Sequence, residues 1–247
     1  MAWELREGER LDDLVRDGMR IIQRPDQFCF SVDSVLLAHF VSVKRRDRFA
    51  ELGTGTGAIA LLLAAFGAAH VTAIEKNPIL ADLAAKSVRG NGKEDVISVL
   101  CADYTKLSEG KSLGSFTAVV VNPPYRPQGA GRLRKGEDVA AATHETTASL
   151  SDVFAAAAQL LQDGGRLFMV HRADRLADLI CEGRKRRFEL KRLRFIQSHE
   201  GEEARRVLLE WRRGGAADVK ILPPLVLHKA DGSYTDEMLA IYGKEST

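Results

Sequence analysis

The sequence predicts an α/β protein with a doubly wound, Rossmann-like sheet that is mostly parallel and has an antiparallel strand at its C-terminal edge. From residue 48 onward, short apolar segments alternate with helical segments at the spacing of βαβ units. Two of these segments, 119–121 and 167–170, lack polar alternation, which is typical of strands covered on both faces. The 247-residue chain is 45% hydrophobic and can bury a substantial core. We expect an N-terminal accessory segment, 1–47, packed on a main domain, 48–247.

The accessory segment is expected to contain a hairpin and a helix. Residues 19–23 alternate like a short strand, and 28–30 resume the alternation after a turn signal. Ser31 or Asp33 can cap the helix predicted through 35–40.

The main domain is expected to follow a βαβ order with an antiparallel end. The predicted strands cover 48–52, 71–75, 96–100, 116–121 and 166–170, and the predicted helices cover 58–66, 78–89, 150–161 and 175–182. Asn77 is a natural cap for the second of these helices. The last two strands, 193–196 and 206–211, are joined by too few residues for a helix, so they are expected to pair antiparallel at the edge of the sheet.

A glycine-rich loop, Glu51-Leu52-Gly53-Thr54-Gly55-Thr56-Gly57, connects the first strand of the main domain to its first helix. Glycines let the backbone turn sharply and approach a ligand closely. The spacing alone indicates a mononucleotide or dinucleotide site. Two details favour S-adenosylmethionine over a dinucleotide. Glu51 stands where a carboxylate can hold a cationic amino group, and the third glycine is spaced for a ligand without a pyrophosphate.

Acidic residues follow three successive strands of the predicted sheet. Glu75 ends the second strand, where it can accept hydrogen bonds from both hydroxyls of a ribose. Asp103 follows the third strand and can accept from an adenine amino group. With Glu51, these acids form a line along the carboxyl edge, where open α/β sheets bind ligands.

The turn Asn122-Pro123-Pro124-Tyr125 directly follows the fourth strand. The prolines fix the backbone and remove two donors, which leaves rigid carbonyl groups. The Asn122 side-chain oxygen and the Pro123 carbonyl can both accept from one substrate amino group, and this keeps the nitrogen lone pair available for attack on a methyl group. Tyr125 offers a flat face against which a planar base or amide can stack.

The loop at 51–57 together with 122–125 resembles the class I S-adenosylmethionine-dependent methyltransferases that modify exocyclic or amide nitrogens. Three further segments resemble a narrower group, the bacterial tRNA1(Val) adenine-37 N6-methyltransferases: Phe28-Cys29-Phe30-Ser31-Val32-Asp33-Ser34-Val35-Leu36-Leu37-Ala38, Leu222-Pro223-Pro224-Leu225 and Ile241-Tyr242-Gly243. The resemblance runs over 11–243, but 129–135 matches nothing in the family that can be aligned.

The resemblance implies the roles of individual residues. The expected cofactor-binding residues are Asp33, Glu51, Gly53, Thr54, Gly55, Gly57, Glu75, Lys76, Asp103, Tyr104 and Asn122. The expected catalytic residues are Asn122, Pro123 and Tyr125. Phe30 and Asp33 are expected to close over the methionine end of the cofactor or over the target base.

Basic residues are clustered although the net charge is only +2. Residues 184–194 hold seven bases and one acid, 126–135 hold four bases and no acid, and 44–48 form a third cluster. Clustered arginine suits phosphate binding, so tRNA is the expected partner. The expected RNA-binding residues are Arg126, Arg132, Arg134, Lys135, Arg184, Lys185, Arg186 and Arg187.

Several classes of protein are disfavoured by the composition. Three distant cysteines and six histidines without ligand spacing argue against disulfides and a metal site. The N-terminus carries acids, and the longest apolar run, 58–69, is too short to span a bilayer, so a cytoplasmic location is expected.

Two other functions remain open from the sequence. The chain could methylate a protein glutamine amide or an rRNA guanine amino group, or it could be an RNA-binding module with a vestigial cofactor pocket. The intact acids and the 122–125 turn disfavour the binding module.

Overall fold

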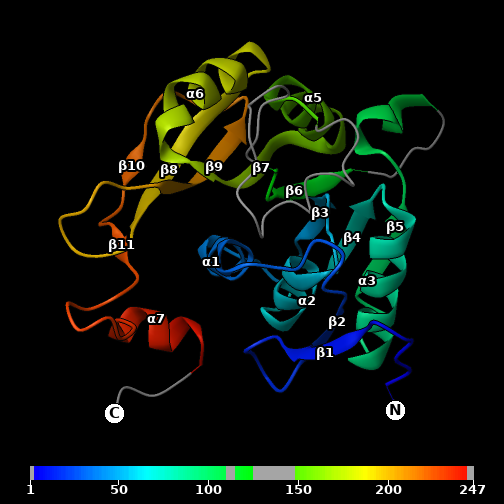
Figure 1. Cartoon of the computed structure of the whole chain (residues 1–247). Coiled ribbons are helices and arrows are strands. Elements are labelled where there is room, and N and C mark those ends of the chain that lie inside the picture. The colour runs from blue at the N-terminus through cyan, green and yellow to red at the C-terminus, as the bar shows by residue number, and fades with distance from the viewer. Residues whose placement is uncertain (1–2, 110–114, 125–147, 244–247) are drawn as a thin grey trace.

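The computed structural model describes residues 3–109, 115–124 and 148–243 (Figure 1). The strands are β1 (Arg10–Asp13), β2 (Arg20–Gln23), β3 (Arg48–Leu52), β4 (His70–Glu75), β5 (Ile97–Cys101), β6 (Phe116–Val121), β7 (Leu161–Arg172), β8 (Phe188–Gln197), β9 (Arg206–Arg213), β10 (Lys220–Ile221) and β11 (Leu225–Val226). The helices are α1 (Val32–Phe40), α2 (Ala58–Ala65), α3 (Pro78–Gly90), α5 (Leu150–Leu160), α6 (Leu176–Lys185) and α7 (Asp236–Ile241), with 3-10 turns η1 (Tyr104–Glu109) and η2 (Ala173–Arg175).

The central sheet has the strand order β10-β8-β9-β7-β6-β3-β4-β5, and β11 also pairs with β8. Strands β5, β4, β3, β6 and β7 are parallel, and β9 is antiparallel to both β7 and β8. This confirms the predicted fold class and the antiparallel pairing of the last two long strands. Strand β9 lies inside the sheet, because it inserts between β7 and β8, and the short strands β10 and β11 pair with the other side of β8.

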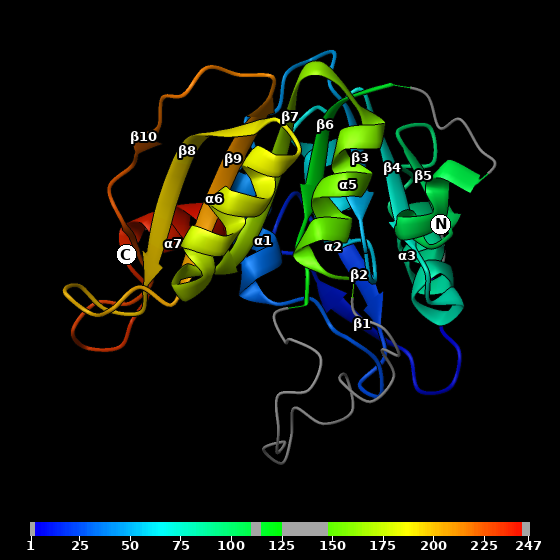
Figure 2. The same cartoon turned by 90° about the horizontal axis from the view of Figure 1, so that it is seen from above.

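Helices cover both faces of this sheet, with α5 and α6 on one side and α1, α2 and α3 on the other (Figures 1 and 2). Alternate residues of each inner strand enter the two cores. In β6, Val119 and Val121 pack in the α5 and α6 core, whereas Ala118 and Val120 pack in the α1 and α2 core. Both faces are therefore apolar, which explains the missing polar alternation.

The N-terminal hairpin differs from the prediction. Strand β2 pairs with β1, Arg10–Asp13, and not with 28–30. The backbone amide of Phe30 donates to the side-chain oxygen Oε1 of Gln23, at 2.8 Å. Residues 28–30 therefore contact β2 through a side chain and do not form a strand beside it. Strand β1 was missed because its sequence, RLDD, has a single apolar residue.

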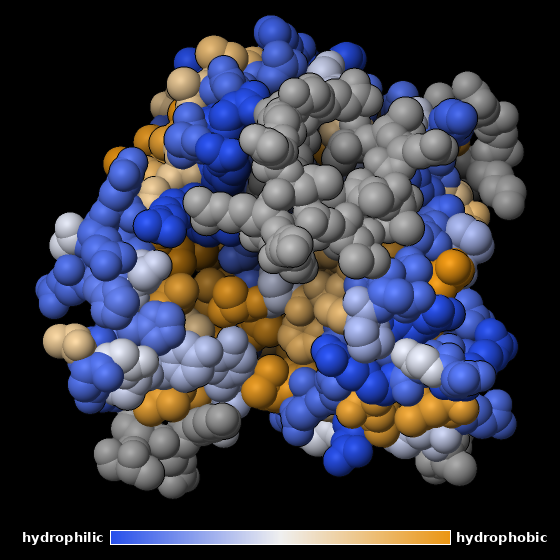
Figure 3. Space-filling model, viewed as in Figure 1, coloured by the Kyte–Doolittle hydropathy of each residue, from blue (hydrophilic) through white to orange (hydrophobic). Residues whose placement is uncertain are grey.

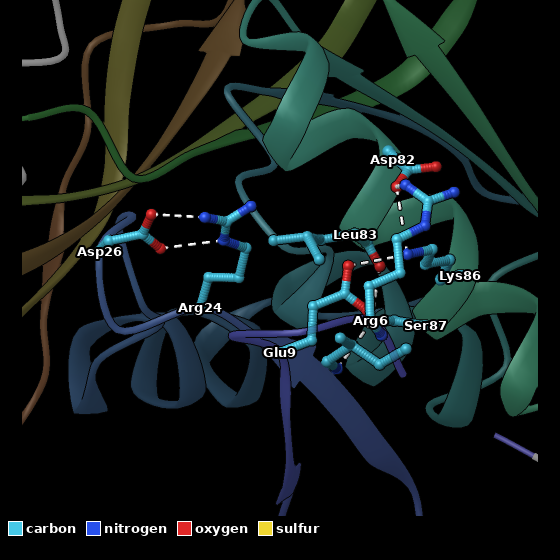
Figure 4. Close-up of polar contacts among 9 residues, drawn as sticks. Arg6, Glu9, Arg24, Asp26, Asp82, Leu83, Lys86 and Ser87 are labelled. Atoms are coloured by element: carbon cyan, nitrogen blue, oxygen red, sulfur yellow. Dashed lines mark hydrogen bonds and ion pairs between the residues drawn. The ribbon is translucent and has the colours of Figure 1, made fainter. Parts of the chain in front are cut away.

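The hairpin is fastened to α3 by polar contacts (Figure 4). The ammonium group of Lys86 on α3 lies 2.7 Å from a carboxylate oxygen of Glu9, and the carboxylate of Asp82, also on α3, lies 3.1 Å from the guanidinium of Arg6. The Ile22 amide donates to the hydroxyl of Ser87 at 2.9 Å. These contacts fix the accessory segment on the main domain.

Strand β7 begins at Leu161, five residues earlier than predicted, immediately after α5. The pairing of β7 with β6 is irregular: Phe116 of β6 pairs with Leu161, but Ala118 pairs with Arg166, so β7 bulges between these two positions. Gly164 sits in this stretch with φ of +74°, a conformation that glycine adopts without strain. Gly164 and its neighbour Gly165 therefore lie inside a bulged strand. Among the described residues, no helix is long and apolar enough to cross a bilayer.

Candidate functional site

A small open hollow lies at the carboxyl edge of the sheet, where the chain order reverses between β3 and β6. Open α/β sheets bind ligands at such a switch point. Figure 3 looks onto this edge and shows a hollow with apolar residues near its centre. The lining residues are Phe28, Phe30, Ser34, Glu51, Gly53, Thr54, Thr56, Ala58, Ile59 and Asn122.

The glycine loop between β3 and α2 forms one wall of the hollow. Gly53, Gly55 and Gly57 have φ of +70°, +59° and +94°, all in the left-handed region that favours glycine. A Cβ at Gly53 would point into open space, whereas one at Gly55 would lie 3.5 Å from the ring of Phe28. The half-exposed Phe28, which comes from the accessory segment, therefore covers the loop.

Glu51 is buried at the base of the loop, 1% exposed. Burial raises the pKa of its carboxyl group to about 8, although a hydrogen bond from the Thr54 hydroxyl at 2.7 Å opposes this shift. The hydroxyl oxygen of Thr56, also buried and lining the hollow, has no hydrogen-bond partner within the described residues. A buried acid and an unsatisfied hydroxyl facing one hollow fit a polar, cationic ligand.

Glu75 braces the loop from the neighbouring strand. One oxygen of its carboxylate accepts from the Gly55 amide and the other from the Asn77 amide, both at 2.9 Å. This bracing role was not predicted from the sequence. Glu75 is 5% exposed and does not line the hollow itself.

The other predicted cofactor residues lie along the adjacent strand ends. Asp103 Oδ1 accepts from the Thr105 amide at 2.9 Å and from its hydroxyl at 2.7 Å. Partial burial raises the pKa of Asp103, but these two hydrogen bonds outweigh it and the net pKa is lowered. Tyr104 begins η1, and burial raises its pKa. Lys76 is exposed after β4.

Asn122 follows β6 and lines the hollow opposite the glycine loop. Its side-chain nitrogen Nδ2 donates to the hydroxyl oxygen of Ser34 on α1, at 3.2 Å. Pro123 is buried next to it, and Tyr125 lies outside the described residues. The structure thus brings Glu51, Gly53 and Asn122 together.

The accessory segment supplies three further lining residues: Phe28, Phe30 and Ser34. Of these, only Phe30 was predicted as a site residue. Asp33 does not line the hollow; its carboxylate lies 3.0 Å from the Arg206 guanidinium at the start of β9. Sequence reasoning missed Ser34 and Thr56, although both lie within the motifs that it singled out.

The predicted RNA-binding residues fall into two groups. Arg126, Arg132, Arg134 and Lys135 lie outside the described residues. Residues 184–187 span the end of α6 and the turn before β8, at the edge of the sheet away from the hollow (Figure 2). Two of them are ion-paired there, Arg184 with Glu189 and Lys185 with Glu182.

Comparison with known proteins assigns the chain to a family. The profile of the methyltransferase small domain family matches residues 19–178. The chain belongs to this family. It is 31% identical over 196 residues to a tRNA1(Val) (adenine(37)-N6)-methyltransferase of Porphyromonas gingivalis, which covers 77% of this chain and 76% of that protein. A protein of the same name from Haemophilus influenzae is 26% identical over 213 residues, covering 85% and 88% of the two chains.

A solved structure has a similar fold over most of the chain. It is described as a predicted O-methyltransferase from Agrobacterium tumefaciens, with a TM-score of 0.67 and 26% identity, and the match covers 87% of this chain and 98% of that one. Family and fold together make the chain an S-adenosylmethionine-dependent methyltransferase, as the resemblance implied.

The residues that line the hollow suit this cofactor by their chemistry. Gly53 leaves open space beside the loop, Thr56 has an unsatisfied hydroxyl within the described part of the chain, and Glu51 is a buried acid able to face a cationic group. S-adenosylmethionine supplies an electrophilic methyl group carried on a sulfonium.

Proposed function

We propose that the chain transfers a methyl group from S-adenosylmethionine to the exocyclic N6 nitrogen of an adenine in tRNA. The observation that supports this most strongly is the position of Asn122, which faces the same hollow as the glycine loop and Glu51. The tRNA relatives support the choice of substrate over a glutamine amide or an rRNA guanine. They also support a cytoplasmic location.

Cofactor binding is assigned to the loop and the strand-end acids. Glu51, once ionised, accepts from the cationic amino group of the methionine moiety, and Gly53 lets the ligand approach the backbone. Glu75 has lone pairs left after bracing the loop, and these accept from the ribose hydroxyls. Asp103 accepts from the adenine amino group, with Lys76 and Tyr104 beside it.

Methyl transfer depends on how Asn122 is oriented. The hydrogen bond from Nδ2 to Ser34 fixes which end of the amide faces α1, and the Oδ1 atom at the other end accepts a proton of the substrate amino group. The Pro123 carbonyl accepts the second proton. The nitrogen forms its bond to the methyl carbon as the carbon–sulfur bond breaks, and it then loses a proton to water. This is catalysis by positioning and hydrogen bonding.

Ser34 is accordingly a positioning residue. It is 5% exposed and sits in the first turn of α1, whose following residues are buried in the core. Arg126, Arg132, Arg134 and Lys135 follow the catalytic turn and are assigned to the phosphates near the target base, against which Tyr125 stacks.

The test is transfer of a tritiated methyl group to bulk tRNA, bulk rRNA and a release factor, each in a separate reaction. We expect label in tRNA, and we expect Asn122→Ala to abolish turnover while calorimetry with S-adenosylhomocysteine shows unchanged affinity. Label in protein alone would refute the proposal. Activity of Asn122→Ala within a few-fold of wild type would refute its assigned role.

A further inference from the structure

The edge of the sheet opposite the hollow is strongly basic. Parallel strands β3, β7 and β8 begin at this edge and the antiparallel β9 ends there, so segments distant in sequence meet (Figure 2). We call the following segments the basic strip: 44–48, 161–166, 184–189 and 212–213. Together they hold eleven basic and three acidic residues, a net charge of +8 in a chain whose total is +2. The rest of the chain is therefore net acidic.

The three acids of the strip are already paired with bases of the strip. Asp47 lies 2.5 Å from Arg166, Glu189 lies 3.1 Å from Arg184, and Asp163 lies 3.7 Å from Arg213. Asp47, with a side chain 6% exposed, is a structural anchor. The acids thus leave most of the positive charge uncompensated.

Seven cations of the strip are exposed and have no ion pair within the described residues. They are Lys44, Arg45, Arg46, Arg48, Arg186, Arg187 and Arg212. Six of the seven are arginines, whose planar guanidinium groups bind phosphate in bidentate fashion. Exposed like charges repel one another, so a cluster of cations without counter-ions favours the binding of a polyanion.

The strip has the dimensions of an extended binding surface. Five neighbouring strands, β8 to β3, span about 19 Å at the usual strand spacing. Beyond β4, the start of β5 is preceded by the exposed acids Glu94 and Asp95, which limit the strip on that side. Strand β6 runs from this edge to Asn122, a distance of about 20 Å. The strip therefore cannot contact a nucleotide whose base is at Asn122.

We propose that the basic strip is a second RNA-binding surface, which holds the sugar–phosphate backbone of a tRNA far from the target nucleotide. This inference rests on the proposed function, because it takes its partner from the proposed substrate. Among the described residues, none of the large exposed apolar side chains lies in the strip. A lipid surface would favour such side chains for insertion, so RNA is the better match. The strip gives affinity, and the hollow gives the chemistry.

The test compares full-length tRNA with a short hairpin that contains only the target loop and its stem. The variant Arg45→Gln/Arg46→Gln/Arg186→Gln/Arg187→Gln removes four exposed charges. For full-length tRNA we expect KM to rise about tenfold or more and kcat to stay unchanged. The slope of log affinity against log salt should fall by about 4, roughly 1 for each phosphate that the variant no longer neutralises. For the hairpin, both constants should stay within twofold of wild type.

The matched control is Arg20→Gln/Arg89→Gln, which removes exposed arginines outside the strip; its KM for tRNA should change less than twofold. An equal rise in KM on the hairpin, or no change on full-length tRNA, would overturn the inference. Fluorescence anisotropy with labelled tRNA measures binding without turnover, so it tests the strip even if the proposed reaction fails. If the quadruple variant loses binding to anionic phospholipid vesicles but still binds tRNA like the wild type, the inference would also be overturned.

Discussion

Replacing Glu51 by glutamine tests how the hollow holds the cofactor. Glu51→Gln keeps the shape of the side chain but cannot become an anion facing the cationic amino group of the ligand. Hydrogen bonds to charged groups contribute about 1.5–3 kcal/mol, so affinity for S-adenosylhomocysteine should fall about 10- to 150-fold. The residue lies 1% exposed, so solvent screening offers little compensation.

The raised pKa of Glu51 adds a pH signature to this prediction. Since the carboxyl group keeps its proton up to pH of about 8 in the free protein, binding that requires the anion must expel that proton. As the pH is raised, affinity for S-adenosylhomocysteine should increase by up to tenfold per pH unit until about pH 8, and above this pH it should level off. At pH 7 calorimetry in buffers of different ionisation enthalpy should detect about one released proton. Glu51→Gln should release none.

The same pKa shift predicts an effect on stability. The unfolded carboxyl ionises near 4.5 and the folded one near 8, so the folded state binds more protons in between and stability falls as pH rises through this window. Glu51→Gln should therefore raise the melting temperature, more at pH 8.5 than at pH 5.5. Glu203→Gln, an exposed acid on the β8–β9 turn, serves as a control and should change neither property. Tight, pH-independent binding by Glu51→Gln would refute the reasoning.

Three further substitutions test the packing around the site by urea unfolding. Lys86→Ala should lower the free energy of unfolding by about 1.5–3 kcal/mol at neutral pH, because it removes the partner of the Glu9 carboxylate. Burial raises the pKa of Glu9, but the hydrogen bonds to its carboxylate outweigh burial and lower the pKa overall. The effect of the substitution should therefore shrink as acid protonates Glu9 below pH 4.5. An unchanged midpoint at pH 7 would contradict this. Gly57→Ala should lower the free energy of unfolding by about 1–2 kcal/mol, because the backbone φ of +94° is strained for alanine. The new Cβ would lie 3.4 Å from Ala84, an ordinary contact, so the cost comes from the backbone alone. A more stable variant would contradict this prediction. Phe154→Ala should cost about 3–5 kcal/mol, since the ring is fully buried among aromatic residues, and a loss below 1 kcal/mol would show that the core is not packed as described.

The middle of the chain was predictable because its signals are local. The glycine loop, the apolar runs of β3 and β4, and the cap at Asn77, whose Oδ1 accepts from the Ile79 amide, each act within a few residues. The fold class follows from their order. Strand β1 could not be read this way, because its polar sequence becomes a strand only by pairing with β2.

The site was predictable in part for the same reason. Glu51 and Asn122 stand at strand ends, and parallel strands bring their carboxyl ends to one edge. Ser34 reaches Asn122 across 88 positions of sequence through the packing of α1, which no local pattern encodes. The basic clusters at 44–48 and 184–187 were visible separately. Only the strand order shows that they share an edge, and that this edge faces away from the hollow.

The division of the chain at residue 47 stays a prediction. Residues of the accessory segment, Leu14 and Ile21 among them, belong to the same core as α2 and β3. The family match also begins within this segment, at residue 19.

Mass spectrometry of the nucleosides from tRNA, after incubation with the protein and S-adenosylmethionine, examines the proposed reaction without assumptions about the site. We predict that N6-methyladenosine accumulates with the wild-type protein and is absent with Asn122→Ala. A methylated guanine in its place, or no methylated nucleoside at all while the protein still binds the cofactor, would contradict methyl transfer to an adenine amino group.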